Sequence, residues 1–439
     1  MDYHPLLDSF AILLISSIVI GFTSPSSNLR VGLLPVLSFL SWHCTLACPQ
    51  YIPRSAWASS VGGYTLSLFL HYLDVAVLSQ WSFDLQGPAK NLLLQPKTKS
   101  QCPSPKKKFP SNDKSPAQSG SIVQRFRYGL SVCFSWRFIN TPYQAQNISR
   151  LDPKLSRSRK RFLASTGLSI LVCYLILNGM DFLADPEITA KFYSVDRIPF
   201  FSRLTLPKDD PKSISLEELG MRFSAAIAMG ASLISVQRGV YNICAFVSVL
   251  IGLSEPDNWP PFNGPFKEIV SLRKFWSVFW HQINTHRLRV ISNFLWYQFF
   301  GFPRDVKPVR YMRPLAIFFV SGLLHVAIDV SSGMYLHESG AMRFFLIQPL
   351  GLMMEDAILG AYYNFNKQPA TMAHRLLGML WVGMWMAWTA PSYLYPVLAK
   401  ADSSSAAGMD RVVPFSIIDW CVKGCEIMIS NFRGTGIKG

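Results

Sequence analysis

Charged residues are scarce in this sequence. Only 15% of its 439 residues are Asp, Glu, Lys or Arg, whereas half are apolar, and the mean hydropathy is positive at +0.22. A single soluble core could not bury this much apolar side chain, so an ordinary soluble globular domain is excluded. The composition predicts a protein that spans a membrane several times.

The sequence also lacks any grouping of cysteines that would suit a metal ion. Its eight cysteines are scattered, several of them within apolar stretches, and the Cys421 and Cys425 pair has no matching pair elsewhere. Buried, reduced thiols are the expected state, and we predict no bound metal. A basic start is missing as well, because Asp2 and Asp8 precede the first apolar stretch, so we expect a retained membrane anchor rather than a cleaved signal peptide.

Long apolar windows recur along the chain and predict an all-α, multi-pass transmembrane fold of about eight to nine spans. The window Val412–Ile429 carries Asp419, Lys423 and Glu426, which leaves it open between a ninth span and a helix in the membrane interface. The other predicted spans are Ser9–Thr23, Val31–Cys48, Val61–Trp81, Phe162–Ala184, Phe223–Leu253, Met312–Val330, Phe344–Tyr363 and Leu376–Leu398.

Acidic residues are nearly absent from one long loop. Between Gly87 and Phe162 there are sixteen Lys and Arg residues, against only Asp113 and Asp152. The loop therefore carries nearly all of the formal charge of +16, which argues against a nucleic-acid-binding face and predicts a cytosolic loop. Its segment Lys97–Ser121, rich in Lys, Pro and Ser, predicts a disordered insertion, either a solvated tether or a contact for anionic lipid.

This charge pattern suggests three parts. They are N-terminal transmembrane helices over residues 1–81, a basic and partly disordered cytosolic loop over 82–162, and a membrane-embedded core over 163–439.

Two histidines stand where a membrane protein rarely places an ionisable group. His325 lies in the middle of the apolar stretch Leu315–Asp329, and His281 follows a run of aromatic residues. On a helix Asp329 would share a face with His325, where its carboxylate could hold the imidazole in one tautomer. Such a pair suits a general base, and it suits the proton relay of a transporter about equally well.

An aromatic motif precedes His281. The stretch from Pro256 to Pro265 has too much Pro and Gly for a span, and we interpret it as a loop at the membrane interface. Ser271 then predicts a helix cap, after which Arg273, Trp276 and Trp280 would share one helix face. Aromatic residues at this spacing are more often packing residues than a binding site, so the motif alone does not establish one.

Taken together, Trp259–Pro265, Ser271–Gln282 and Ser321–His325 resemble the wax-synthase-like branch of the membrane-bound O-acyltransferase superfamily. The upstream segment Arg137–Asn147 is similar to fungal members that acetylate terpenoid and meroterpenoid alcohols. The chain departs from the family pattern in two places. Ser277 replaces a glycine that often follows the Phe-Trp pair, and Val326 replaces an acidic residue that often follows the second histidine, which leaves Asp329 as the candidate orienting group.

The resemblance implies transfer of an acyl group from coenzyme A to an alcohol inside a membrane-embedded tunnel. His325 would act as the general base on the acceptor hydroxyl, and His281 would hydrogen-bond the developing oxyanion or position the thioester. No acyl-enzyme is expected, because no serine or cysteine is visibly paired with either histidine. Residues expected at the donor are Arg273, Trp276, Trp280 and Gln282.

Cations lie between the two histidines, at the expected mouth of the site. They suit the phosphates of coenzyme A, but the preference of cytosolic segments for positive charge explains them equally well. The sequence does not choose among Arg273, Lys274, Arg287, Arg289, Arg304, Lys307, Arg310 and Arg313.

The leading prediction is an integral-membrane O-acetyltransferase of a terpenoid-type secondary metabolite, located in the endoplasmic reticulum. Its partners would be acetyl-CoA as co-substrate, a hydrophobic alcohol and the lipid bilayer, with no bound cofactor and no nucleic acid. Three alternatives stay open: a long-chain acyltransferase making wax, sterol or glyceride esters, a proton-coupled transporter with a His325/Asp329 relay, and a non-catalytic membrane scaffold.

Overall fold

The computed structural model describes residues 3–93, 120–304, 308–365, 371–404, 413, 416–420 and 423. The predicted disordered insertion Lys97–Ser121 lies almost wholly outside the described residues. The same holds for most of the window Val412–Ile429.

The described part of the chain is mostly helical and confirms a multi-pass membrane protein. Six helical segments are long and apolar enough to cross a bilayer, and α1 (Leu6–Phe22) is a shorter apolar helix. The six are α2 (Leu29–Gly32) with α3 (Leu34–Tyr51), α4 (Ser55–Tyr72) with η1 (Leu73–Leu78), α7 (Arg159–Phe182), α10 (Leu216–Leu250), α13 (Val309–Ser331) and Ala341–Tyr362 of α14 (Ala341–Phe365).

Two details differ from the sequence prediction. The window Leu376–Leu398 holds two helices, α15 (Met372–Thr389) and α16 (Pro391–Ser404), because Pro391 favours a helix start over a continuing helix. The fold is also not entirely helical, since Trp81–Ser82 (β1) and Gly87–Pro88 (β2) form an antiparallel pair.

The remaining helical elements are short and connect the long ones. Two of them, η5 (Phe275–Phe279) and η6 (Phe294–Phe299), are π-helical like η1 (Leu73–Leu78) at the end of the α4 segment, and this form is uncommon and frequent at functional sites. The others are α5 (Ile122–Phe134), α6 (Pro153–Ser156), α8 (Pro186–Phe192), η2 (Val195–Arg197), α9 (Phe201–Leu204), η3 (Pro256–Asn258), η4 (Phe266–Glu268), α11 (Leu272–Lys274) and α12 (Thr285–Asn293).

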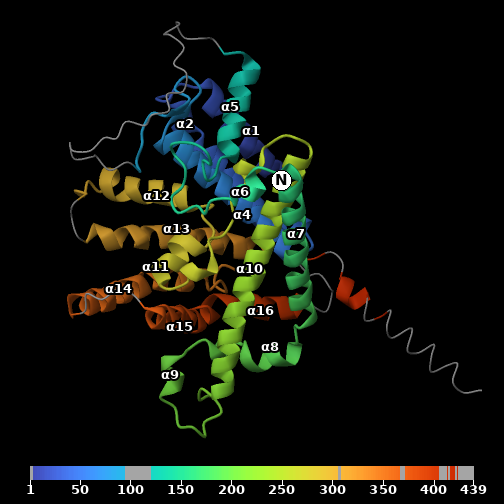
Figure 1. The fold of residues 1–439 in the computed structure, drawn as a ribbon, viewed down its shortest axis with the longest axis vertical. Helices are drawn as coiled ribbons and strands as arrows, with labels where there is room; N and C mark the ends of the chain where they lie inside the picture. Colours follow the sequence, from blue (N-terminus) through green and yellow to red (C-terminus); the bar gives the residue numbers. More distant parts are fainter. Residues whose placement is uncertain are drawn as a thin grey trace, which may run out of the picture.

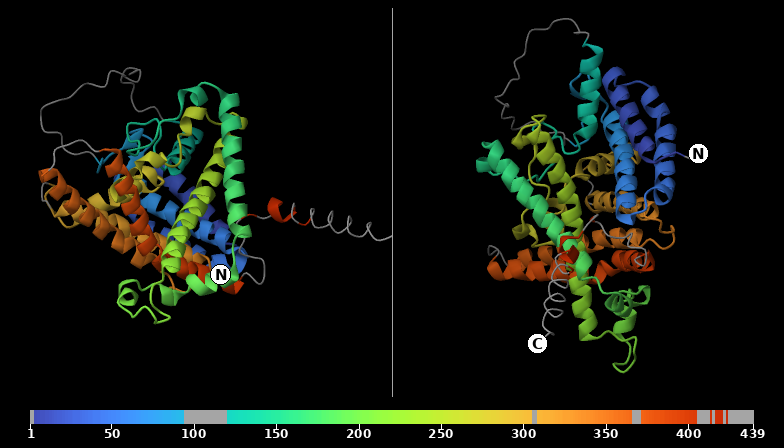
Figure 2. Two further views of the ribbon diagram at one scale, coloured as in Figure 1. Left: turned by 60° about the horizontal axis from the view of Figure 1, so that its bottom comes forward. Right: turned by 90° about the vertical axis from the view of Figure 1, so that its right-hand side faces the viewer.

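Two large buried apolar clusters lie among the helices, beside smaller ones. One includes Ile12, Leu37 and Tyr72, from α1, α3 and α4; the other includes Phe318 and Trp385, from α13 and α15. Helices α12, α13 and α14 form successive layers in Figure 1, and α13 also contacts α3 and α4. The long helices α7 and α10 run beside one another along the side of these layers (Figure 2). Helix α13 thus lies between the two clusters, with Phe318, Gly322 and Leu324 on its buried side.

Candidate active site

His325 lies midway along α13 with its ring fixed by the backbone. Its Nδ1 atom is 2.7 Å from the carbonyl oxygen of Ser321, one helical turn earlier. Because a carbonyl can only accept, Nδ1 carries the proton, and Nε2 keeps the lone pair that a general base requires. The sequence had predicted Asp329 for this orienting role. The geometry gives it to Ser321, which at i−4 is directly within reach of the ring.

Asp329 is instead the centre of a separate hydrogen-bonded group beside the histidine. Its buried carboxylate accepts from the Ser339 hydroxyl at 2.6 Å and from the Tyr393 hydroxyl at 3.3 Å. The Tyr393 ring meets the His325 ring edge-on, with centroids 5.9 Å apart. Burial first, and then the Asp329 charge, raise the pKa of Tyr393 well above its usual value, so this phenol keeps its proton. Tyr393 thus contacts Asp329 through its hydroxyl and His325 through its ring.

Close packing of α14 against α13 walls the other side of His325. The Phe345 ring lies 4.3 Å from the His325 ring, centroid to centroid. A Cβ at Gly322 would lie only 2.7 Å from the sulfur of Met342, so this glycine permits the close approach. An apolar wall excludes water, which would otherwise compete with an alcohol for the base.

His281 is held differently, in an extended segment after the π-helical turn η5. The rings of Phe262 and Trp280 lie 5.9 and 5.3 Å from it, and its buried Nδ1 has no hydrogen-bond partner in the part of the chain that the structure describes. Burial, followed by electrostatic interaction with His325 and then Arg287, lowers the pKa of His281 to about 3. His281 is therefore neutral near pH 7, and His325 is one of the groups that interact with it electrostatically.

Asn263 supplies a second pair of unused polar atoms next to His281. Both its amide nitrogen and its amide oxygen are buried without a partner among the described residues. The following residue, Gly264, donates its N–H to the Phe279 carbonyl at 2.9 Å, which places Asn263 against the turn that leads into His281. A buried polar atom without a partner is costly, so such a cluster marks a place where a ligand would complete the hydrogen bonds.

The segment Arg137–Asn147 fastens this loop. Arg137 donates to the Pro261 carbonyl at 3.0 Å, to the Pro260 carbonyl at 3.2 Å and to the Tyr241 hydroxyl at 2.5 Å, and burial lowers the pKa of Arg137. Asn147 donates its amide to the Ser277 carbonyl at 3.0 Å. The segment Arg137–Asn147 thus contacts both the Pro256–Pro265 loop and the turn before His281, although it lies far from them in the chain.

The residues predicted to contact the donor have partners within the protein. Ser271 caps α11 as predicted, accepting from the Lys274 N–H. Arg273 pairs with Asp356 at 2.6 Å. The Gln282 amide donates to the Trp280 carbonyl at 2.7 Å and accepts from Thr285 at 2.9 Å.

The aromatic pair of the motif is anchored to α14. The Trp276 indole donates to the Gln348 amide oxygen at 3.3 Å, and the rings of Trp276 and Trp280 meet edge to face at 5.9 Å. The buried Glu355 carboxylate accepts from the Leu272 N–H at 2.6 Å at the start of α11, where the helix dipole favours negative charge. These contacts fix the position of the segment that carries His281.

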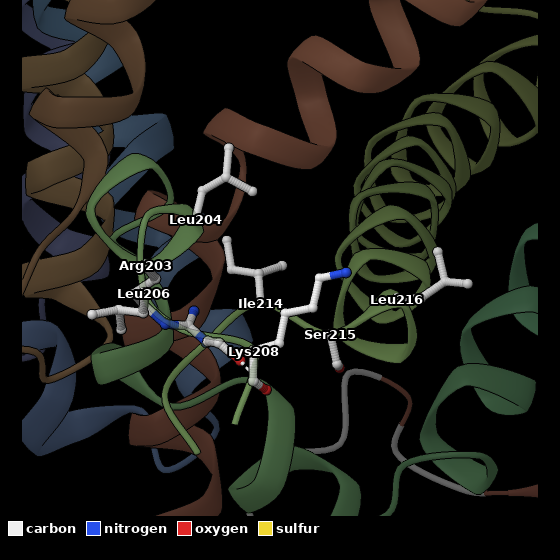
Figure 3. Close-up of a pocket in the computed structure, with 8 residues that line it drawn as sticks. Arg203, Leu204, Leu206, Lys208, Ile214, Ser215 and Leu216 are labelled. Atoms are coloured by element: carbon white, nitrogen blue, oxygen red, sulfur yellow. Dashed lines mark hydrogen bonds between the residues drawn. The ribbon is translucent and has the colours of Figure 1, made fainter. Parts of the chain in front are cut away.

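A cavity of about 390 Å³ lies elsewhere, between α9 and the start of α10 (Figure 3). Arg203 at its edge pairs with Glu218 at 2.6 Å, and Lys208 and Ile214 also line it. None of its lining residues belongs to the histidine site, so this cavity is separate from it. Among the described residues, no group of His, Cys, Asp and Glu could hold a metal ion.

Comparison with known proteins connects this geometry to a family. A model described as the membrane bound O-acyl transferase family matches residues 259–347, the span that holds Asn263, His281 and His325. The chain is 32% identical over 386 residues to the acetyltransferase aurG of Calcarisporium arbuscula, covering 87% of this chain and 90% of that protein. It belongs to the membrane-bound O-acyltransferase family.

Other relatives have the same activity. The chain is 30% identical to the acetyltransferase fsoF of Humicola fuscoatra, over 88% of this chain and 94% of that one. It is 25% identical to the acetyltransferase nanB of Aspergillus nanangensis, over 94% and 92%. No solved structure matches the chain. The predicted activity is confirmed: this membrane-bound O-acyltransferase is an acetyltransferase.

Proposed function

We propose that the protein transfers acetyl from acetyl-CoA to a hydroxyl of a hydrophobic, terpenoid-type alcohol. The observation that carries the proposal is the fixed tautomer of His325. Its Nδ1 is committed to the Ser321 carbonyl, so Nε2 is available to take a proton, and His281 lies within electrostatic range. Fungal relatives described as acetyltransferases support the acetyl donor.

His325 activates the acceptor. A hydroxyl is a weak nucleophile until a base removes its proton, and Nε2 of His325 takes that proton as the alcohol oxygen attacks the thioester carbonyl. The new C–O bond forms, the C–S bond breaks, and the proton on His325 returns to the departing thiolate. The products are an acetate ester and free coenzyme A, with His325 neutral again.

His281 and Asn263 stabilise the thioester oxygen. Within the described ranges, the buried Nδ1 of the neutral His281 ring and the buried amide nitrogen of Asn263 have no hydrogen-bond partner. When attack places negative charge on the carbonyl oxygen, N–H donors held in advance in a water-poor site stabilise it strongly. Tyr393 and Asp329 position the His325 ring from its other side.

The finer architecture is part of the same proposal. We expect eight or nine spans, a tunnel past both histidines, residence in the endoplasmic reticulum, and the three-part division at residues 81 and 162. The expected contacts of Trp276 and Trp280 with the donor also stay predictions. The cationic loop before α7 supports a cytosolic entrance for an anionic donor.

The proposal is tested with membranes that contain the chain, labelled acetyl-CoA or palmitoyl-CoA, and a panel of hydrophobic alcohols. We expect an acetate ester, with acetyl-CoA preferred over palmitoyl-CoA. Loss of the base in His325→Ala should slow ester formation by about 10²- to 10⁴-fold. The matched control is His337→Ala, an exposed histidine in the turn after α13, which should keep the wild-type rate.

Two outcomes contradict the proposal. Ester formation at the wild-type rate in His325→Ala would remove the general-base assignment. A preference for palmitoyl-CoA would favour a long-chain acyltransferase.

A further inference from the structure

The structure sorts the cations near the site by whether a carboxylate neutralises them. Arg273 and Arg310 both pair with Asp356, at 2.6 and 3.2 Å, and Lys274 pairs with Glu268 at 2.9 Å. These three are partnered surface charges, so they need no ligand. Lys307 lies outside the described residues.

Arg289 and Arg313 differ from these three cations in their ion pairing. Neither has a carboxylate within ion-pair distance in the described ranges, and the buried Nε of Arg313 has no hydrogen-bond partner there. Helix α12, which carries Arg289, packs on α13, which carries Arg313, and the Ser292 hydroxyl of α12 donates to the Arg313 carbonyl at 3.1 Å. Burial, and then the charge of Arg313, lower the pKa of Arg289. Two partly buried cations placed side by side are unfavourable unless an anion joins them.

A cavity of about 120 Å³ opens at Arg289, between the segment 142–146 and the start of α12. This exceeds the roughly 10 to 15 Å³ that one water needs, so it can admit a small polar group. Its polar lining is rich in hydrogen-bonding groups. They come from Asn91, Gln144, Gln146, Thr285, His286 and Arg289.

The walls of this cavity are already ordered. Arg289 donates to the Gln146 amide oxygen at 2.7 Å. Nδ1 of His286 is 2.8 Å from the buried carboxylate of Asp74, in the π-helical turn η1, and the His286 ring packs on Phe138 at 4.6 Å. Asp74 is thereby engaged, and among the described residues no carboxylate lines the cavity.

We propose that this cavity, with Arg289 and His286 in its lining and Arg313 on the helix that packs beside Arg289, binds the phosphate groups of the coenzyme A donor. The inference rests on the proposed function and assigns a role to the segment Arg137–Asn147. An unneutralised guanidinium is a strong partner for phosphate oxygens, and neighbouring amides and hydroxyls add further hydrogen bonds.

The position of the cavity matches such a ligand. Helix α12, which carries His286 and Arg289, begins at Thr285, directly after the segment of His281. The other wall belongs to the segment whose Arg137 and Asn147 hold the Asn263 loop and the η5 turn. One donor molecule can therefore place its phosphates here while its thioester reaches the histidines.

The test compares two donors, acetyl-CoA and S-acetylpantetheine, which has the thioester but no phosphate. In Arg289→Gln we expect the KM for acetyl-CoA to rise by about 10- to 100-fold, because a charge-assisted hydrogen bond is lost. The KM for S-acetylpantetheine and both kcat values should stay within about twofold. Arg125→Gln is the control, since this arginine of the basic loop pairs with Asp84 at 2.9 Å and does not line the cavity.

A second readout is independent of catalysis. Adenosine 3′,5′-bisphosphate should raise the Tm of the purified wild-type protein and of Arg125→Gln, and should lose this effect in Arg289→Gln. If Arg289→Gln does not melt cooperatively, Arg313→Gln takes its place in both experiments.

Several results overturn the inference. They are equal KM changes for both donors, equal stabilisation by inorganic phosphate, or stronger stabilisation by phosphatidylserine vesicles, which would indicate a lipid headgroup site. If the wild type forms no ester but the bisphosphate effect depends on Arg289, the proposed function fails and the binding site stands.

Discussion

The surroundings of His325 and His281, the two histidines of the candidate site, differ. His325 belongs to a regular helix, and its Nδ1 is held at 2.7 Å by the Ser321 carbonyl. His281 belongs to an irregular segment between a π-helical turn and α12, and its Nδ1 is buried without a partner in the described structure. One ring has a fixed proton position, and the other has an open hydrogen-bonding position.

The difference agrees with the separate roles that we propose for the two rings. A base must present a lone pair in a constant direction, which a helix supplies through its own carbonyl one turn earlier. A group that stabilises the oxyanion must have a donor that is unused until the substrate arrives, and a helix interior rarely leaves one. In the irregular segment that carries His281, the ring Nδ1 has no partner in the described structure and stays available to a substrate.

Substitution of His281, whose Nδ1 has no partner in the described structure, should change the rate more than substitution of Tyr393. Replacing His281 by Ala removes a donor to the oxyanion, so kcat should fall by about 10²- to 10³-fold, while His281→Gln, which keeps an N–H group, should recover part of the loss. Rates are measured with saturating acetyl-CoA. If His281→Gln is no better than His281→Ala, hydrogen bonding is not what His281 provides.

A smaller effect on kcat is expected from Tyr393, whose ring packs on His325. Tyr393→Phe removes the hydroxyl that donates to Asp329 at 3.3 Å but keeps the ring that packs on His325. Because Tyr393 is a positioning residue, kcat should fall by about threefold to tenfold, with little change in KM, and the pH–rate profile should shift. Asp329→Asn serves as the companion variant. An unchanged kcat and profile in both would show that the group is purely structural.

The smallest effect is on stability. The pKa of His281 is about 3 in the folded protein, against an ordinary value of about 6.5. Between these values the unfolded chain binds the proton, so acidification favours unfolding and stability falls as pH drops through this window. From pH 7.5 to 5, the wild type should lose roughly 1 to 2 kcal/mol more than His281→Gln. Denaturant melts of both proteins at the two pH values check this, and parallel losses would contradict it.

Local sequence patterns predicted much of the fold and part of the site. Hydropathy located the long helices because a bilayer demands about 20 apolar residues, and the isolated His325 was conspicuous for the same reason. Ser271 as a cap followed from the chemistry of helix ends. The break at Pro391 was missed, since its apolar flanks read as one window.

Other parts of the site had no local signal. Tyr393 lies far along the chain from Asp329 and reaches it only through the packing of α16 against α14. The unused amide of Asn263 is visible only once its neighbours are placed. The cations between the histidines look alike in sequence. Asp356, which pairs with Arg273 and Arg310, lies in α14 and meets them only in the folded protein.

The sequence by itself determined a membrane solvent, the helical segments, and two histidines too costly to be accidental, because these follow from transfer energies of single residues and short windows. Only the tertiary structure decided that Ser321 rather than Asp329 fixes the proton on His325, that His281 and Asn263 have buried polar atoms without a partner among the described residues, and that Arg289 and Arg313 lack carboxylate partners in the same part of the chain. Hydrogen bonds and ion pairs form between atoms brought together by packing, and that pairing is a property of the folded arrangement.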